Sequence, residues 1–166
     1  MGRRNRRFLA EGIAFTGIAD KGKSVGRDSE GRVFFVEGAV PGDVADVQVL
    51  RKKKGHFQGR LERLLKASPD RVAPFCQHFA HCGGCKWQHL SYDAQLRHKQ
   101  QVVEDAMKRI GKVEVEAFEP ILGAEATDHY RNKLEFTFSN RRWLAPEDLN
   151  TEVSNEADVL GFHPPG

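Results

Sequence analysis

The first third of the chain alternates apolar and polar positions with a period of two, which is typical of half-buried strands. A hairpin signal at 28–31 leads into the apolar run 33–36. A turn at 41–43 precedes alternating positions at 46–49, and the same alternation recurs at 57–62. The pattern therefore predicts several short strands joined by tight turns.

Nine glycines between residues 12 and 59 are spaced as turn and bulge positions between such strands. The basic run 51–54 is interpreted as the link to the last strand. Five short strands in about 60 residues predict an OB-like barrel over residues 1–67, with an SH3-like barrel as the alternative.

A boundary is predicted at residues 68–74, where Pro69 and Pro74 interrupt the strand pattern. A helix is predicted next, with Ser91 as its N-cap, Asp93 in its first turn and Gly111 at its end. Its apolar residues form one stripe, which favours packing over function; they are Leu96, Val103, Met107 and Ile110.

The last third returns to the period of two. Alternation at 133–138 predicts a strand with one buried face, followed by a turn at Asn140. Residues 146–158 are interpreted as a solvated acidic loop, and a further strand is predicted to begin at 159. The apolar positions of the first strand are Leu134, Phe136 and Phe138.

The composition is that of a globular protein: 166 residues, 39% hydrophobic and 30% charged, which excludes a disordered chain. No apolar run is long enough for a membrane span, and the basic start lacks the apolar stretch of a signal peptide. Three closely spaced cysteines do not suit a secreted disulfide scaffold, so a cytoplasmic setting is expected.

The net charge of +3 hides a polarity along the chain. Residues 1–66 carry 15 Lys and Arg against 8 Asp and Glu, whereas residues 111–166 carry 5 against 11. The basic first third indicates an anionic partner. A solvated charged face is the competing interpretation.

The spacing Cys76-x5-Cys82-x2-Cys85 is the strongest chemical signal, because thiolates at such spacing bind soft or borderline metals. Gly83 and Gly84 let the backbone curl closely around such a centre. Tetrahedral zinc or a four-iron cluster requires four ligands. Either a histidine such as His89 (His78 and His81 are also near) completes the set, or the fourth ligand lies outside this chain.

A basic–aromatic patch is predicted at a barrel loop, since OB-like barrels bind single-stranded nucleic acid through basic grooves and stacked aromatics. Lys21, Lys23 and the run 3–7 add positive charge nearby in sequence. Phe15, Phe34 and Phe35 are interpreted as core residues in preference to stacking residues. The patch comprises Arg51, Lys52, Lys53, Lys54, His56 and Phe57.

The stretch from Cys76 through CGGCKWQ to Gly111 resembles the cluster region of the iron–sulfur-containing RNA (uracil-5-)-methyltransferases that modify 23S ribosomal RNA. The preceding barrel resembles the TRAM domain of that family, and Tyr130–Phe136 (YRNKLEF) resembles a strand of its central domain. The implied fold is mainly β with α: a TRAM barrel, then a truncated α+β central domain (68–166) that carries the cysteine cluster site.

The resemblance implies a [4Fe–4S] cluster held by Cys76, Cys82 and Cys85, with a fourth cysteine expected shortly beyond Gly166. It also implies a catalytic domain that binds S-adenosylmethionine, which this sequence does not match, so no catalytic residue is assigned here. The expected partner is RNA, with no membrane, and the expected state is a monomer. RNA backbone contacts near a flipped uridine are expected from Arg131, Lys133, Arg141 and Arg142, unless these are solvated charges.

A second hypothesis is a free-standing nucleic-acid-binding module stabilised by Cys3His zinc, with His89 as the histidine.

Overall fold

The computed structural model describes residues 7–144 and 148–162. It divides into two compact units: Met1–Ala73 with His89–Gly123, and Pro74–Gln88 with Ala124–Gly166. Residues 3–6 of the predicted basic run, 146–147 of the acidic loop and the chain end at 163–166 lie outside the described residues. The predicted domain division at residues 67 and 68 stays a prediction.

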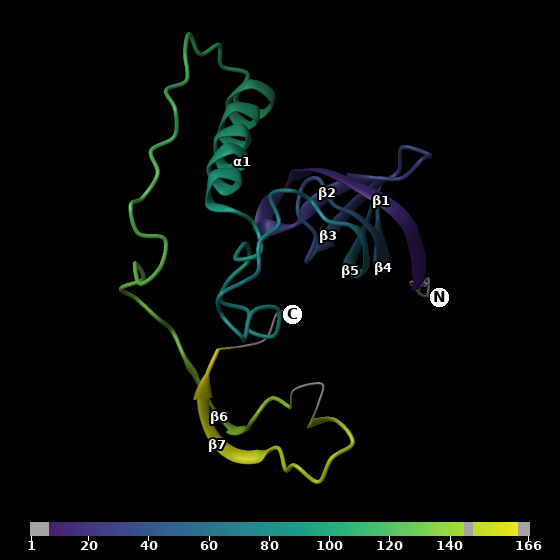
Figure 1. Ribbon diagram of the computed structural model, residues 1–166, viewed down its shortest axis with the longest axis vertical. Helices are drawn as coiled ribbons and strands as arrows, with labels where there is room; N and C mark the ends of the chain where they lie inside the picture. The colour runs from purple at the N-terminus through teal and green to yellow at the C-terminus, as the bar shows by residue number, and fades with distance from the viewer. Residues whose placement is uncertain (1–6, 145–147, 163–166) are drawn as a thin grey trace. The chain divides into compact units, whose positions relative to one another are not determined.

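The first unit contains a closed barrel whose strands neighbour one another in the order β1-β2-β3-β5-β4 (Figure 1). Four neighbouring pairs are antiparallel, and the parallel pairing of β3 with β5 completes the closure. The predicted five-stranded barrel is therefore confirmed. Its strands are β1 (Phe8–Ile18), β2 (Ser24–Arg27), β3 (Val33–Glu37), β4 (Val44–Lys53) and β5 (His56–Lys66), with a short 3-10 turn η1 (Asp20–Gly22) after β1.

The barrel interior is filled by alternate residues of the strands, as the period of two requires. Phe34 and Val36 of β3 are buried, whereas Phe35 between them is only half-buried. Phe15 is also buried, so Phe15 and Phe34 are core residues as predicted, and Phe35 is not. The remaining core comprises Ala10, Ile13, Ala39, Ala45, Val47 and Val49.

Two glycines allow the barrel to be this tight. A Cβ on Gly59 would lie 2.4 Å from the carbonyl oxygen of Gln48, and one on Gly26 would lie 2.7 Å from Ile13. Both strands therefore approach their neighbours at positions that tolerate no side chain.

The turn at 41–43 is fixed by a buried ion pair. The Asp43 carboxylate accepts hydrogen bonds from the backbone N–H groups of Val40 and Ser68, at 2.8 and 2.9 Å, and from the Arg71 guanidinium. Burial alone raises the pKa of Asp43, but Arg71 and these N–H groups outweigh it, so the pKa lies below its ordinary value. This contact ties the segment after the barrel to the barrel itself.

The helix α1 (Tyr92–Asp105) begins after Ser91 as predicted, although the Ser91 side chain makes no capping hydrogen bond. It continues as a π-helical turn, η2 (Ala106–Gly111), and Lys112 rather than a glycine takes the left-handed conformation after it, with φ of 51°. The entry to α1 is held against the post-barrel segment by the Arg71–Leu90 bridge and by hydrogen bonds at 68–72. No helix in the described ranges is long and apolar enough to cross a membrane.

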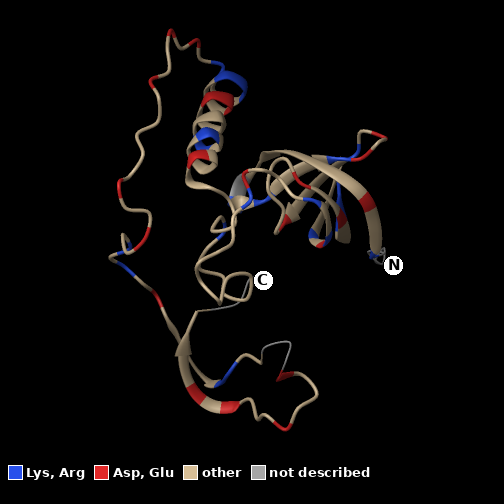
Figure 2. Ribbon diagram, in the orientation of Figure 1, with Lys and Arg blue, Asp and Glu red and all other residues tan. Residues whose placement is uncertain are grey.

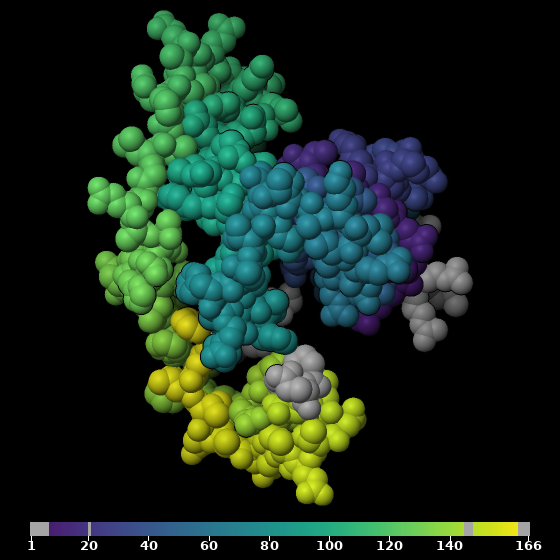
Figure 3. Space-filling model, in the orientation of Figure 1, coloured from purple at the N-terminus to yellow at the C-terminus, as the bar shows by residue number. Residues whose placement is uncertain are grey.

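The predicted packing stripe of this helix is largely exposed. Leu96 is half-buried, but Val103, Met107 and Ile110 are exposed, the last at 83%. The reason is that no described element of this unit covers that side of the helix beyond its first turns. Figure 3 shows the side chains of the helix end and of the segment after it at the surface.

The second unit contains one two-stranded sheet, β6 (Thr137–Arg141) with β7 (Glu156–Gly161). The predicted strand after the acidic loop is present, but β7 begins at Glu156, inside the predicted loop 146–158, and ends at Gly161. The prediction of a half-buried strand at 133–138 is wrong: β6 begins only at Thr137, Asn140 lies inside it, and Leu134, Phe136 and Phe138 are exposed. A two-stranded ribbon cannot bury one of its faces without a further layer.

Candidate nucleic-acid interface and cysteine segment

The basic run 51–54 belongs to a β-hairpin and not to a loop between strands. Arg51, Lys52 and Lys53 lie in β4 opposite Gln58, Phe57 and His56 of β5, and a two-residue turn at 54–55 joins the strands. Gly55 takes the left-handed conformation, with φ of 84°, that such a turn requires. The correction matters because a hairpin fixes the backbone positions of these residues relative to β5.

The aromatic part of the hairpin is packed on the barrel core. The Phe57 ring stacks on Phe34 at a centroid separation of 5.0 Å and meets the edge of Phe8 at 5.6 Å. The Lys52 ammonium lies 5.4 Å from the Phe57 ring centroid, which is cation–π geometry. Lys52 and Phe57 therefore close one end of the core.

The four charges of the hairpin are not compensated by ion pairs, unlike several other cations of the barrel unit. Across the described part of the chain, none of the four cations at 51–54 forms an ion pair, and all four are exposed. Elsewhere Lys23 pairs with Glu37, Arg63 with Asp46 and Arg71 with Asp43. Figure 2 shows acidic and basic residues side by side in the β2–β3 hairpin as well. Arg27, Arg60 and Lys66 of the described strands form no ion pair either, but they lie singly along the sequence, whereas four such cations are consecutive at this hairpin.

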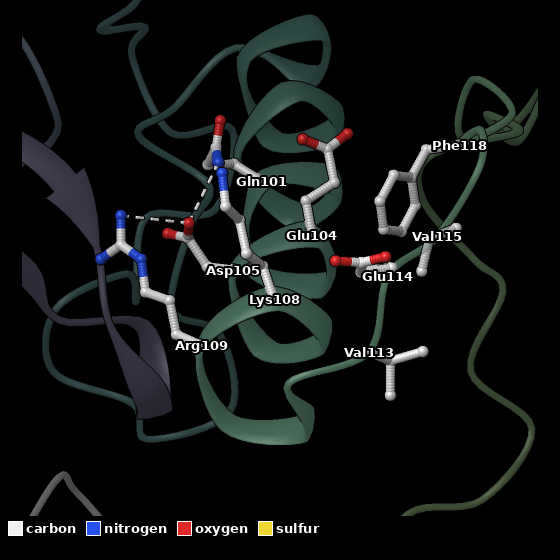
Figure 4. A pocket seen from close by; sticks show the side chains of 9 residues that line it. All are labelled: Gln101, Glu104, Asp105, Lys108, Arg109, Val113, Glu114, Val115 and Phe118. Atoms are coloured by element: carbon white, nitrogen blue, oxygen red, sulfur yellow. Dashed lines mark hydrogen bonds and ion pairs between the residues drawn. The ribbon is translucent and has the colours of Figure 1, made fainter.

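A pocket at the end of the helix has a lining of mixed charge. It lies between the end of the helix and the segment 113–118 (Figure 4). Three acids and two bases line it, and Arg109 is paired with Asp105 at 3.3 Å. A polyanion gains less from such a pocket than from the hairpin.

A comparison with known families decides what this barrel is. Residues 12–62 match the TRAM domain. The match begins within β1 and ends within β5, so it covers most of the closed barrel, including the basic hairpin.

The chain is also similar to proteins of several bacteria. It is 52% identical over 159 residues to a protein of Porphyromonas gingivalis named "Uncharacterized RNA methyltransferase", covering 93% of this chain and 34% of that protein. A protein of Bacteroides thetaiotaomicron with the same name is 47% identical, over 90% of this chain and 33% of that protein. One of Thermotoga maritima, also with this name, is 38% identical, over 81% of this chain and 30% of that protein. The chain spans about a third of these relatives.

The cysteines follow the TRAM barrel in a segment of tight turns in the second unit. Cys76 and Cys82 are half-buried and Cys85 is exposed, and all three thiols are free. The backbone N–H of Gly84 lies 3.4 Å from the Cys82 sulfur, and a Cβ on Gly84 would lie equally near it. N–H groups directed at thiolate sulfurs are a feature of iron–sulfur sites.

The donor chemistry therefore suits a thiolate-bound metal, but the arrangement does not complete a site. Among the described residues, no group of three or more His, Cys, Asp or Glu side chains is placed to hold a metal ion. His89 belongs to the first unit, where it is buried. Burial and the nearby Arg71 charge lower the pKa of His89. A backbone hydrogen bond with Ala39 and the Asp43 charge raise it, but by less, so the pKa lies below its ordinary value.

The structure brings together only two of the four cations predicted in the central part. Arg131 and Lys133 line one pocket with Gly83 and Gly84 of the cysteine segment. Arg141 lies exposed at the end of β6. The Arg142 guanidinium pairs with Asp148 at 2.7 Å, so its charge is compensated.

Proposed function

We propose that this chain is the RNA-recognition and cluster-bearing part of an S-adenosylmethionine-dependent methyltransferase that acts on uracil C5 of 23S ribosomal RNA. One observation carries the RNA-binding part: four consecutive exposed cations without ion pairs lie on the β4–β5 hairpin of the TRAM barrel. The name of the relatives supports methyl transfer.

The hairpin supplies affinity more than sequence choice, because phosphate contacts position a protein on RNA without reading bases. Arg131, Lys133, Arg141 and Arg142 are proposed to contact the RNA backbone near the target uridine, which must leave its stack to be modified. The Asp148 pairing of Arg142 makes it the weakest of these four candidates. The protein is further proposed to act in the cytoplasm as a monomer.

The catalytic residues and the S-adenosylmethionine site are proposed to lie in the part of the relatives that this chain does not span. All three cysteines of the chain are assigned to the metal segment, which leaves none as a nucleophile. A full-length relative is expected to transfer a methyl group from S-adenosylmethionine to uridine in 23S ribosomal RNA. Failure to methylate any RNA would contradict the enzymatic part of the proposal.

A neutralised hairpin is expected to lose affinity for single-stranded RNA. The variant Lys52→Gln/Lys53→Gln/Lys54→Gln removes up to three phosphate contacts, so the slope of log K against log salt should fall by about 2, at about 0.7 per contact. The matched control, Lys108→Gln/Arg109→Gln/Lys112→Gln, removes three exposed charges from the helix end. Fluorescence anisotropy at several salt concentrations measures both variants. Equal salt slopes in the hairpin variant and the wild type would show that the RNA-binding site is not at the hairpin.

A [4Fe–4S] cluster is proposed at Cys76, Cys82 and Cys85, where it would be held by thiolates. Anaerobically purified protein is expected to show broad visible absorption, with iron and sulfide, that Cys82→Ser reduces. Colourless protein with one zinc per chain would favour the Cys3His module instead. His89→Gln is the discriminating variant: zinc loss in it would support that alternative, whose weakness is that His89 is buried within the barrel unit.

A further inference from the structure

The strand register sorts the hairpin side chains onto two faces. Directly opposed residues of neighbouring strands lie on the same side of a sheet. Arg51 opposes Gln58 and Lys53 opposes His56 across β4 and β5, while Phe35 of β3 also opposes Gln58. These five residues, the outer platform, lie on the side away from the core, because Phe34 and Phe57 take the alternate positions.

The centre of the outer platform is a pair of aromatic rings. The Phe35 and His56 rings are 4.9 Å apart between centroids and inclined at 77°. Both are half-buried, so each keeps part of its ring open to solvent, and the Gln58 amide nitrogen lies 3.5 Å from His56 Nε2. A half-exposed phenylalanine on the outside of a barrel contributes little to the core.

Cations flank this pair from one side. Arg51 and Lys53 are exposed and, within the ranges that the structure describes, form no ion pair. Lys52 differs, because it lies over the Phe57 ring at the end of the core. The outer platform thus combines an aromatic surface, two free cations and an amide that can both donate and accept hydrogen bonds.

We infer that the outer platform is a base-stacking site for single-stranded RNA. An unstacked base lies on the Phe35 ring beside His56, and the phosphates on either side of that base meet Arg51 and Lys53. Stacking tolerates any base, so the site holds a strand without reading its sequence. This inference rests on the proposed RNA-binding function and assigns it to particular residues: Phe35 takes the base, and Arg51 and Lys53 take the neighbouring phosphates.

The test uses the full chain and two fluorescein-labelled probes of about 12 nucleotides, an oligouridylate and an abasic oligomer with the same backbone. Phe35→Leu keeps an apolar side chain and removes the aromatic face. We expect it to weaken oligouridylate binding about fivefold or more, with no change for the abasic oligomer and no change in salt slope. Phe35→Trp should bind as the wild type or tighter. Lys53→Gln should weaken both probes alike. Far-UV circular dichroism melts confirm that each variant is folded.

The outcomes separate this inference from the proposed function. Equal binding of oligouridylate by Phe35→Leu and wild type, or equal weakening for both probes, overturns the stacking site. If the lysine-to-glutamine hairpin variant still loses affinity in that case, RNA binding by the hairpin stands. Failure of the wild type to bind either probe would remove the RNA-binding function and the stacking site together.

Discussion

Asp43→Ala is expected to lower the free energy of unfolding by about 3–5 kcal/mol, because it leaves the Arg71 guanidinium partly buried without its partner. It also leaves the backbone N–H groups of Val40 and Ser68 without the carboxylate that accepts their hydrogen bonds. Urea unfolding followed by far-UV circular dichroism measures the loss. Glu30→Ala is the control, since Glu30 is exposed in its pair with Arg32 and should change stability by about 0.5 kcal/mol or less. Similar values for both variants would contradict the role of Asp43.

The pH dependence of that loss follows from the lowered pKa of Asp43. A carboxyl with a lower pKa when folded contributes stability above its unfolded pKa, about 3.9, and this stability disappears as the pH falls through the folded pKa. The difference between wild type and Asp43→Ala should therefore be full near neutral pH and shrink below about pH 4. A double-mutant cycle with Arg71→Met then measures the interaction energy of the pair, because the stability changes at two contacting residues are not additive.

Phe34→Ala is expected to cost about 3–5 kcal/mol, the usual range for removing a buried phenylalanine. Phe34 is 1% exposed and stacks on Phe57, so the cavity left by alanine is closed to water and is filled only in part by neighbouring side chains. The matched control is its neighbour: Phe35→Ala lies on the outer face and should cost less than half as much. The same urea titrations measure both. Equal losses would mean that Phe35 belongs to the core after all.

The barrel could be predicted from the sequence because its strands follow a period of two and its turns carry the residues they need. The same period distinguishes Phe34 from Phe35, since two adjacent strand residues face opposite sides. The interpretation of Phe15, Phe34 and Phe35 alike as core residues does not make that distinction. The residue types of the basic hairpin are evident in the sequence, but charged runs are usually loops, so the pattern does not place residues 51–53 in a strand.

Features that depend on distant partners could not be predicted. Asp43 and Arg71 are 28 positions apart, and no local pattern links a turn aspartate to an arginine beyond the barrel. The apolar stripe of α1 and the alternation at 134–138 both signal a buried face, yet burial needs a covering surface that the described residues do not supply. The cysteine spacing indicates donor chemistry alone, because the positions of the sulfur atoms depend on the folded turns between them.

The parallel pairing of β3 with β5 sets the order of events during synthesis. β3 ends at Glu37, and the residues of β5 that pair with it are 57–60, so the barrel cannot close until residue 60 has left the ribosome. Until then β3 has a free edge that can pair with other chains. Closure requires the pairing of strands that are not consecutive in sequence, β1 with β4 and β3 with β5, so this domain is expected to fold more slowly than a helical one of equal length.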